Sequence, residues 1–132
     1  MSDEALILFA NDAFYNAFAA RDFPAMEDIW TKDTEPTCVH PGWPPLVGRN
    51  QVMNSWRDIL NDDESNPIAC TNAQAYRCGE GAYVTCHEHM GRSFLIATNI
   101  FLRENGQWKI IHHQAGAALS PNRTTQATST LQ

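Results

Sequence analysis

The sequence has few basic residues and no cluster of them along any predicted element. It contains 9 Lys and Arg against 15 Asp and Glu, which gives a formal net charge of −6. Nucleic acids and anionic membrane surfaces attract proteins mainly through clustered Lys and Arg side chains. We therefore expect neither nucleic acid nor a membrane surface as a partner.

Long apolar runs are also missing. No stretch approaches the roughly 20 apolar residues that a membrane-spanning helix needs. The chain begins Met1-Ser2-Asp3-Glu4, which is acidic where a secretory signal peptide would be basic. These features predict a cytoplasmic protein.

The sequence lacks the short motifs that mark common cofactor and metal sites. Four cysteines occur, at positions 38, 70, 78 and 86, and no two of them form a C-x-x-C pair. There is no G-x-G-x-x-G, no P-loop and no G-x-S-x-G. We therefore expect reduced thiols packed as small hydrophobic groups, and no cofactor.

What is present indicates one folded domain. The chain has 132 residues, of which 43% are hydrophobic and 18% charged, a globular balance. Residues 120–132 are polar and rich in Ser and Thr, with too little apolar surface to pack. We assign residues 1–119 to the domain and 120–132 to a polar C-terminal tail.

The first half of the chain has helical periodicity. Apolar residues recur at three- and four-residue spacing in 3–21, where the expected apolar face comprises Leu6, Phe9, Ala10, Ala13 and Ala17, with Phe14 and Phe18 beside them. Asp22 can cap a second, short helix that carries Met26 and Trp30. After a short extended segment at 36–40 and a proline-rich loop at 41–45, Asn50 can cap a third helix over 51–61.

The second half has the features of strands and tight turns. Residues 68–78, 82–90, 93–104 and 107–116 are predicted as strands, and Asn105-Gly106 is typical of a tight hairpin. Four strands joined by such short links form an antiparallel meander. The fold class is therefore α+β, with a curved antiparallel sheet against three helices and a small apolar pocket between them.

The third and fourth of these strands are apolar on both faces. A sheet with one face in water would alternate more regularly between apolar and polar residues. We expect the helices to cover one face and a second copy of the protein to cover the other, which predicts a homodimer formed through the sheet.

Several segments resemble a known superfamily. The order of elements is that of the nuclear transport factor 2-like (NTF2-like) superfamily, and within it the chain resembles the SnoaL-like group. The similar segments are Ala20-Arg21-Asp22-Phe23, TCVHPGW at 37–43 with Gly48-Arg49 and Ser55-Trp56, and the last two strands at 97–101 and 106–113. The resemblance covers about residues 5–118 and implies a cone-shaped, cystatin-like fold with a pocket between sheet and helices.

The candidate catalytic residues are two histidines. His40 ends the short extended segment, just before a Pro-Gly-Trp loop that can form one rim of the pocket, and histidine transfers protons near neutral pH. Its expected partner is His113 or Asn99. Alternatively, His40 only fixes the loop by hydrogen bonds to the backbone.

Other residues are expected to bind the ligand. Acid–base isomerases of the superfamily set a carboxylate base against a hydrogen-bond donor. Tyr15 is a candidate donor and Asp33 a candidate base, but we favour Asp33 as a solvated turn residue and do not carry over that mechanism. Trp43 and Trp56 can stack on a planar apolar ligand, although Trp30, Trp56 and Trp108 are most simply core residues. The expected ligand-binding set is Tyr15, Trp43, Trp56, His87 and Asn99.

His87 and His89 form an H-x-H pair whose side chains emerge on one face of a strand. Such a pair can supply two ligands to a metal ion, with a third from His40, His112 or His113. Because no complete ligand signature is present, we favour hydrogen bonding by these histidines and predict no metal.

Three functions remain open at this point. The first is a small-molecule-binding protein whose ligand is a small apolar molecule. The second is a cofactor-free lyase, isomerase or hydrolase that acts on a small apolar metabolite by histidine acid–base chemistry. The third is a dimerisation module without a ligand.

Overall fold

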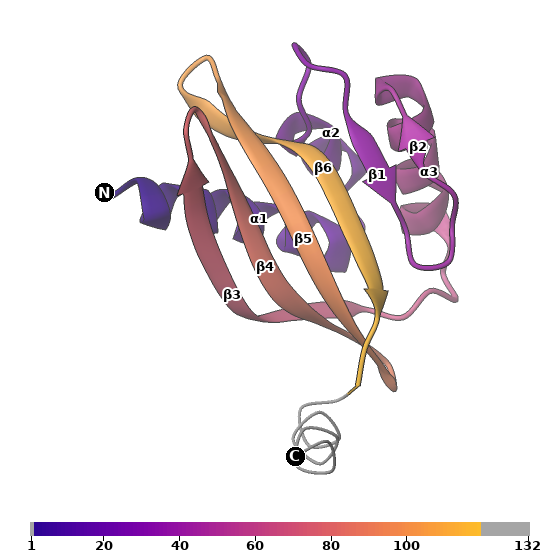
Figure 1. Ribbon diagram of the computed structural model, residues 1–132. Helices are drawn as coiled ribbons and strands as arrows, with labels where there is room; N and C mark the ends of the chain where they lie inside the picture. The colour runs from indigo at the N-terminus through magenta and orange to yellow at the C-terminus, as the bar shows by residue number, and fades with distance from the viewer. Residues whose placement is uncertain (1, 120–132) are drawn as a thin grey trace, which may run out of the picture.

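The computed structural model describes residues 2–119 and contains three helices and six strands in that range (Figure 1). The helices are α1 (Asp3–Ala19), α2 (Phe23–Ile29) and α3 (Arg49–Asn61). The strands are β1 (Thr37–Val39), β2 (Leu46–Val47), β3 (Ile68–Cys78), β4 (Gly81–Met90), β5 (Ser93–Glu104) and β6 (Gln107–Ala117). The predicted α+β class is confirmed, and the expected tail at 120–132 lies outside the described residues.

The six strands form one sheet in the order β2-β1-β6-β5-β4-β3. The four long strands make the predicted antiparallel meander. Two features of the sheet were not predicted: β1 pairs with β6 in parallel, and the two-residue β2 pairs with β1 as the edge strand. The sheet is therefore mixed rather than wholly antiparallel. The predicted extended segment at 36–40 contains β1, but its pairing with β6 is a long-range contact that the local sequence does not show.

Two bulges bend the long strands. The β3–β4 register shifts between Thr71 and Gln74, where Asn72 adopts a positive φ of 54°. The β5–β6 register shifts between Ile100 and Phe101, which leaves Ile111 as the extra residue. Such irregularities bend a strand and increase its twist, so the sheet curves around the helices.

The sheet has an inner face that carries the helices and an outer face that does not. Figure 1 shows α1 and α2 behind the sheet and α3 beside its β1–β2 edge. Phe14, Trp30 and Trp56 are fully buried between these layers. The expected core positions of Trp30, Trp56 and Trp108 are confirmed, because all three are at most 7% exposed.

Two details of the helices correct the sequence-based expectations. Phe9, expected on the buried face of α1, is 69% exposed, whereas the expected Phe14 and Ala17 are buried together with Ile7, Asn11 and Tyr15. The helix is apolar over most of its circumference, so periodicity alone does not orient it. The third helix begins at Arg49 after Gly48 rather than after an Asn50 cap.

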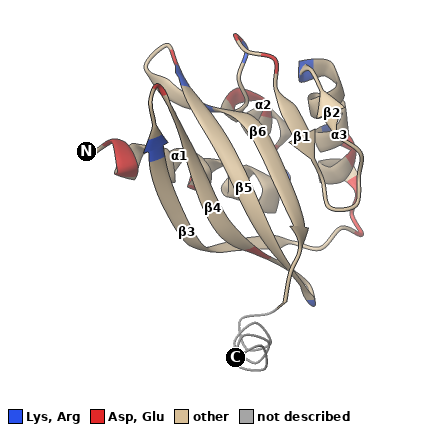
Figure 2. Ribbon diagram, viewed as in Figure 1, with Lys and Arg blue, Asp and Glu red and all other residues tan. Residues whose placement is uncertain are grey.

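Within the described residues, no helix combines the length and apolarity needed to cross a lipid bilayer. Charged residues lie mostly on the helices and in the loops and turns, and the middle of the sheet carries few (Figure 2). One exception is Glu88, an acidic residue that is 2% exposed on β4. This buried carboxyl directs attention to the inner face around it.

Candidate functional site

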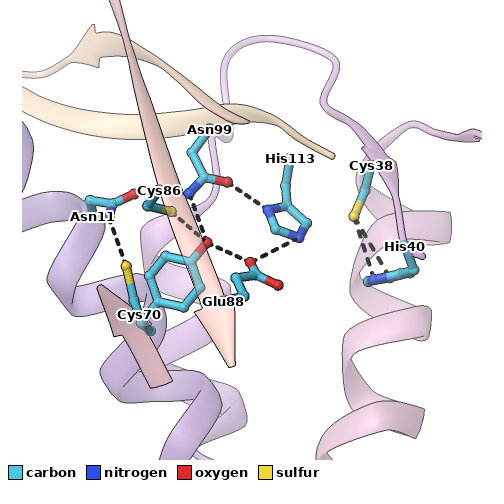
Figure 3. Close-up of polar contacts among 9 residues, drawn as sticks. Asn11, Cys38, His40, Cys70, Cys86, Glu88, Asn99 and His113 are labelled. Atoms are coloured by element: carbon cyan, nitrogen blue, oxygen red, sulfur yellow. Dashed lines mark hydrogen bonds and ion pairs between the residues drawn. The ribbon is translucent and has the colours of Figure 1, made fainter. Parts of the chain in front are cut away.

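The inner faces of three neighbouring strands bring polar side chains together beneath α1. Successive residues of a strand point to opposite faces, so Cys86 and Glu88 of β4 point inward while His87 points outward. Asn99 of β5 and His113 of β6 are direct cross-strand partners on the same inner face. Figure 3 shows these side chains converging with Asn11 of α1.

Glu88 lies at the centre of this cluster. Its Oε2 accepts a 2.6 Å hydrogen bond from the Tyr15 hydroxyl and lies 4.0 Å from Nε2 of His113. Burial raises the pKa of Glu88 to about 6, and the hydrogen bond from Tyr15 opposes that rise. Glu88 is therefore a carboxylate that titrates close to neutral pH.

His113 is held by a chain of amide hydrogen bonds. Its Nδ1 lies 2.5 Å from Oδ1 of Asn99, whose Nδ2 donates to Oδ1 of Asn11 at 2.9 Å and to the Tyr15 hydroxyl at 3.2 Å. Burial, and next the nearby His40, lower the pKa of His113 to about 3. The imidazole is therefore neutral at physiological pH.

His40 lies on the opposite side of the cluster, directly after β1. It is 4% exposed, and its Nε2 lies 2.9 Å from the Ser55 hydroxyl of α3. Its ring contacts Trp43 and Trp56 edge to face, with centroids 4.8 Å apart in both cases. Burial lowers the pKa of His40 to about 4, so this imidazole is also neutral near pH 7.

A cavity of about 230 Å³ is lined by His40, Glu88 and His113, and the rings of the two histidines lie with centroids 6.4 Å apart. Apolar groups form most of its wall, and the loop before β3 forms part of its rim. The lining residues are Phe18, His40, Pro41, Trp43, Ile59, Ser65, Asn66, Glu88, Met90 and His113. The expected hollow under the helices is therefore present, and His40 faces it.

Arg21 fixes the rim of this cavity. Arg21 has a left-handed backbone, with φ of 54°, and its guanidinium donates to the carbonyls of Leu60, Asp62 and Ser65. These bonds tie the end of α3 and the following loop to the turn after α1. The rim is thus positioned by a planar donor that satisfies several carbonyls at once.

The expected site residues fall into three groups. His40, Trp43 and His113 line the cavity. Tyr15, Asn99 and Trp56 are buried behind this wall, where they hold the lining groups in place. His87 lies on the outer face, within 3.5 Å of Asn72, and does not line the cavity.

The H-x-H pair does not converge with the other histidines. His89 is hydrogen-bonded to Thr71 at 2.9 Å on the outer face, whereas His40 and His113 lie inside. In the part of the chain that the structure describes, no three His, Cys, Asp or Glu side chains are grouped closely enough to hold a metal ion. Asp33, expected in a solvated turn, is exposed.

Glu88 is the central residue that the sequence-based reasoning did not assign to the site. The alternation of β4 contained a signal for it. Val84, Cys86 and Met90 occupy inner-face positions, so a carboxylate between them at position 88 must be buried. A buried carboxylate is unusual enough to mark a candidate site.

Two larger hollows open on the helical side of the molecule. One, of about 400 Å³, lies between α1 and α2, and the other, of about 330 Å³, lies between α1 and the β5–β6 turn. Neither is lined by Glu88, His113 or the buried side chains that contact them, which are Asn11, Tyr15, Cys86 and Asn99. We therefore place the candidate site at the smaller cavity, where the titratable groups meet.

Comparisons with known proteins agree with the fold described above. The family model for the SnoaL-like domain matches residues 7–120. A crystal structure from Streptomyces avermitilis, provisionally assigned as a dehydratase of the NTF2-like family, is 31% identical, with a TM-score of 0.81. The alignment covers 89% of this chain and 97% of that one.

Other similar proteins carry different descriptions. A structure from Thiobacillus denitrificans, provisionally described as a calcium/calmodulin-dependent protein kinase type II association domain, is 28% identical, with a TM-score of 0.75; it covers 83% of this chain and 93% of its own. The F-box protein SKIP8 of Arabidopsis thaliana is 27% identical over 116 residues, which are 86% of this chain and 50% of that protein. The chain thus spans about half the length of this curated relative.

Proposed function

This chain belongs to the SnoaL-like domain family of the NTF2-like superfamily, and we propose that it is a small-molecule-binding protein whose ligand occupies the cavity between His40 and Glu88. The observation that carries this proposal is the arrangement of the cavity wall. Apolar side chains surround a few polar groups, and those groups are already fixed by hydrogen bonds. Such walls are typical of ligand pockets.

The size of the cavity limits the ligand. Pockets for drug-sized molecules typically measure about 300–1,000 Å³, and this one holds about 230 Å³. Trp43 is 43% exposed at the rim, where it can cover a bound molecule, while Ile59 and Met90 supply apolar wall. We therefore propose a small ligand with an apolar body.

Thermal unfolding in the presence of a panel of small apolar metabolites tests this function. A ligand that binds only the folded state raises Tm in a concentration-dependent manner. The shift is expected to disappear in Trp43→Ala and to persist in Phe9→Ala, which alters the larger hollow beside α1. Loss of the shift in Phe9→Ala alone would move the site to that hollow, and no shift with any compound would contradict the proposal.

A second candidate is a cofactor-free lyase or isomerase. It is favoured by the pKa of about 6 at Glu88, which suits a group that accepts and returns a proton near neutral pH. The relative from Streptomyces avermitilis, provisionally assigned as a dehydratase, supports the same candidate. In this mechanism Glu88, rather than the expected pair His40 and His113, accepts the proton, because pKa values of about 4 and about 3 make the two imidazoles weaker bases than the Glu88 carboxylate.

Turnover separates the two candidates. An enzyme loses kcat in Glu88→Gln while the cavity still binds, and its rate follows the titration of Glu88 near pH 6. A binding protein shows no turnover of a bound ligand at any pH. Ligand identification by mass spectrometry before and after incubation distinguishes these outcomes.

We further propose a cytoplasmic homodimer that pairs through the outer face of the sheet. Tyr76, Tyr83 and Ile96 are large apolar side chains that remain exposed on that face, and the rings of Tyr76 and Tyr83 stack on each other. Exposed apolar surface favours association. The four cysteines are free, which suits a reducing compartment. If dimerisation were the whole function, the cavity would bind nothing.

A further inference from the structure

The polar end of the cavity offers hydrogen-bond acceptors rather than donors. The Tyr15 hydroxyl donates to Glu88, and both amide hydrogens of Asn99 are used, one on Asn11 and one on Tyr15. The remaining Asn99 oxygen, Oδ1, must therefore accept from Nδ1 of His113. This fixes the tautomer of His113, whose Nε2 is left with a lone pair beside Glu88.

The same accounting applies to His40. The Ser55 hydroxyl donates its single hydrogen to the Val52 carbonyl at 2.7 Å. Its oxygen therefore accepts from Nε2 of His40 at 2.9 Å, so that the Nδ1 atom of His40 is an acceptor. Each of the two imidazoles that line the cavity thus donates its only N–H to a protein atom, and its other ring nitrogen is an acceptor.

Glu88 has no cationic partner. Its Oε2 receives the bond from Tyr15, and no protein donor within residues 2–119 reaches Oε1. His113 is 4.0 Å away but neutral, because burial lowers its pKa to about 3. Among residues 2–119, no Lys or Arg lines the cavity. Burying a carboxylate without a counter-ion costs desolvation free energy, and a cation bound beside Glu88 would offset part of that cost.

Aromatic rings face the same space. Phe18 and Trp43 belong to the cavity wall, where their rings offer apolar surface to the body of a ligand. The net charge of −6 adds a long-range field that repels anions and attracts cations. Charge and hydrogen-bond polarity therefore select a cation, and the aromatic wall selects an apolar body.

We propose that the cavity recognises a small apolar primary amine in its protonated form, with the ammonium seated against Oε1 of Glu88 and Nε2 of His113. The apolar body lies among Phe18, Ile59 and Met90 and reaches toward Trp43. This inference rests on the proposed binding function and names the chemical class of its ligand. An ammonium supplies three donors, and the polar end of the cavity supplies acceptors for them.

Isothermal titration calorimetry at pH 7.5 with three probes of one size tests the inference. Benzylamine, benzyl alcohol and benzoate share a ring and differ in the charge of their polar group. We expect benzylamine to bind at least tenfold more tightly than benzyl alcohol, and benzoate to show no binding. Equal affinities, or preference for benzoate, would overturn the assignment to amines.

Two variants place the charge effect at Glu88. Glu88→Gln removes the buried charge, while Glu80→Gln removes one charge from the exposed β3–β4 turn. The affinity for benzylamine should fall at least tenfold in Glu88→Gln and stay within twofold of wild type in Glu80→Gln, with benzyl alcohol little affected by either. An unchanged benzylamine affinity in folded Glu88→Gln contradicts the inference, and if this variant does not fold, the wild-type comparison of the three probes decides.

The outcomes also separate this inference from the function on which it rests. Binding of benzyl alcohol or benzoate that Trp43→Ala abolishes retains the proposed small-molecule function and rejects the amine. Binding that Trp43→Ala leaves intact belongs elsewhere and rejects both. Absence of binding by all three probes, together with a blank metabolite panel, also rejects both.

Discussion

The Tyr15 hydroxyl donates a 2.6 Å hydrogen bond to Oε2 of Glu88, joining α1 to β4 across 73 positions of sequence. Both side chains are at most 5% exposed. The bond holds a carboxylate at the wall of the cavity in a fixed orientation, although burial opposes its ionisation. The fold thus retains a group that costs stability, which is typical of functional sites.

Replacing Glu88 by Gln should stabilise the protein at high pH. The folded pKa of about 6 lies above the reference value of 4.5, so folding favours the protonated carboxyl. The resulting contribution to the free energy of unfolding is about 2 kcal/mol. It is complete below pH 4.5 and is lost as the pH rises through 6. Urea unfolding should show Glu88→Gln more stable than wild type by about 1–2 kcal/mol at pH 8 and nearly equal at pH 4.5. Glu80→Gln serves as the control, and a loss of stability in Glu88→Gln at pH 8 would contradict the burial argument.

Acid should destabilise the fold through the two buried imidazoles. Folding lowers the pKa of His113 from 6.5 to about 3 and that of His40 from 6.5 to about 4. Below pH 6.5 both histidines are therefore protonated in the unfolded chain before they are protonated in the folded protein. Each histidine removes up to about 1.4 kcal/mol per pH unit in that range, and protonation of Glu88 offsets part of this loss.

The pH dependence of unfolding checks this effect. His113→Gln should reduce the slope of the unfolding free energy against pH between pH 6.5 and 4, because one of the two buried histidines with a lowered pKa is removed. His89→Gln, on the outer face, is the matched control for the loss of a histidine side chain. Equal slopes for wild type and His113→Gln would count against a neutral buried His113.

Tyr15→Phe should destabilise the fold and raise the pKa of Glu88 further. The substitution removes the donor to Glu88 and an acceptor for Asn99, and a lost buried partner costs about 1–3 kcal/mol. Tyr83→Phe is the control, since Tyr83 only stacks on Tyr76 on the outer face. Denaturant unfolding gives the stability, and NMR titration of the Glu88 carboxyl carbon gives the pKa. An unchanged Glu88 pKa would show that the hydrogen bond has no influence on it.

The two tryptophans of the expected ligand set should behave differently. Trp43 is 43% exposed at the rim, so Trp43→Ala should weaken ligand binding while changing stability by less than about 1 kcal/mol. Trp56 is fully buried against Phe14, Phe18 and His40, so Trp56→Ala should cost about 3–5 kcal/mol. Calorimetric binding and denaturant unfolding on both variants check this contrast. A severe loss of stability in Trp43→Ala would contradict the position of Trp43 at the exposed rim.

A charge on the outer face should separate the proposed dimer. Ile96 is 40% exposed on β5, so Ile96→Glu introduces charge repulsion at the expected interface with little effect on the core. Size-exclusion chromatography with light scattering should give a dimer mass for wild type and a monomer mass for Ile96→Glu. Phe9→Glu, on the helical side, should remain dimeric. A monomeric wild-type protein at micromolar concentration would contradict the dimer.

The sequence predicted the elements because their signals are local. Apolar spacing in the first half and the Asn105-Gly106 turn depend on neighbouring residues, and the four long strands occur where they were expected. The family resemblance was confirmed over nearly the same residues. By contrast, β2 has two residues and no propensity signal, and the orientation of α1 could not be read from a helix that is apolar on most sides.

The candidate site was predictable only in part. His40, Trp43 and His113 could be proposed because they lie in or near a distinctive loop or a predicted strand, and the structure places them around one cavity. The role of Glu88 depends on which face of β4 the helices cover. Glu88 and His87 point to opposite faces, so covering the other face would bury His87 and expose Glu88. Local sequence therefore determined the strands and the alternation of their side chains, whereas only tertiary packing decided which face was buried, because burial is a property of the elements packed against a strand and not of the strand itself.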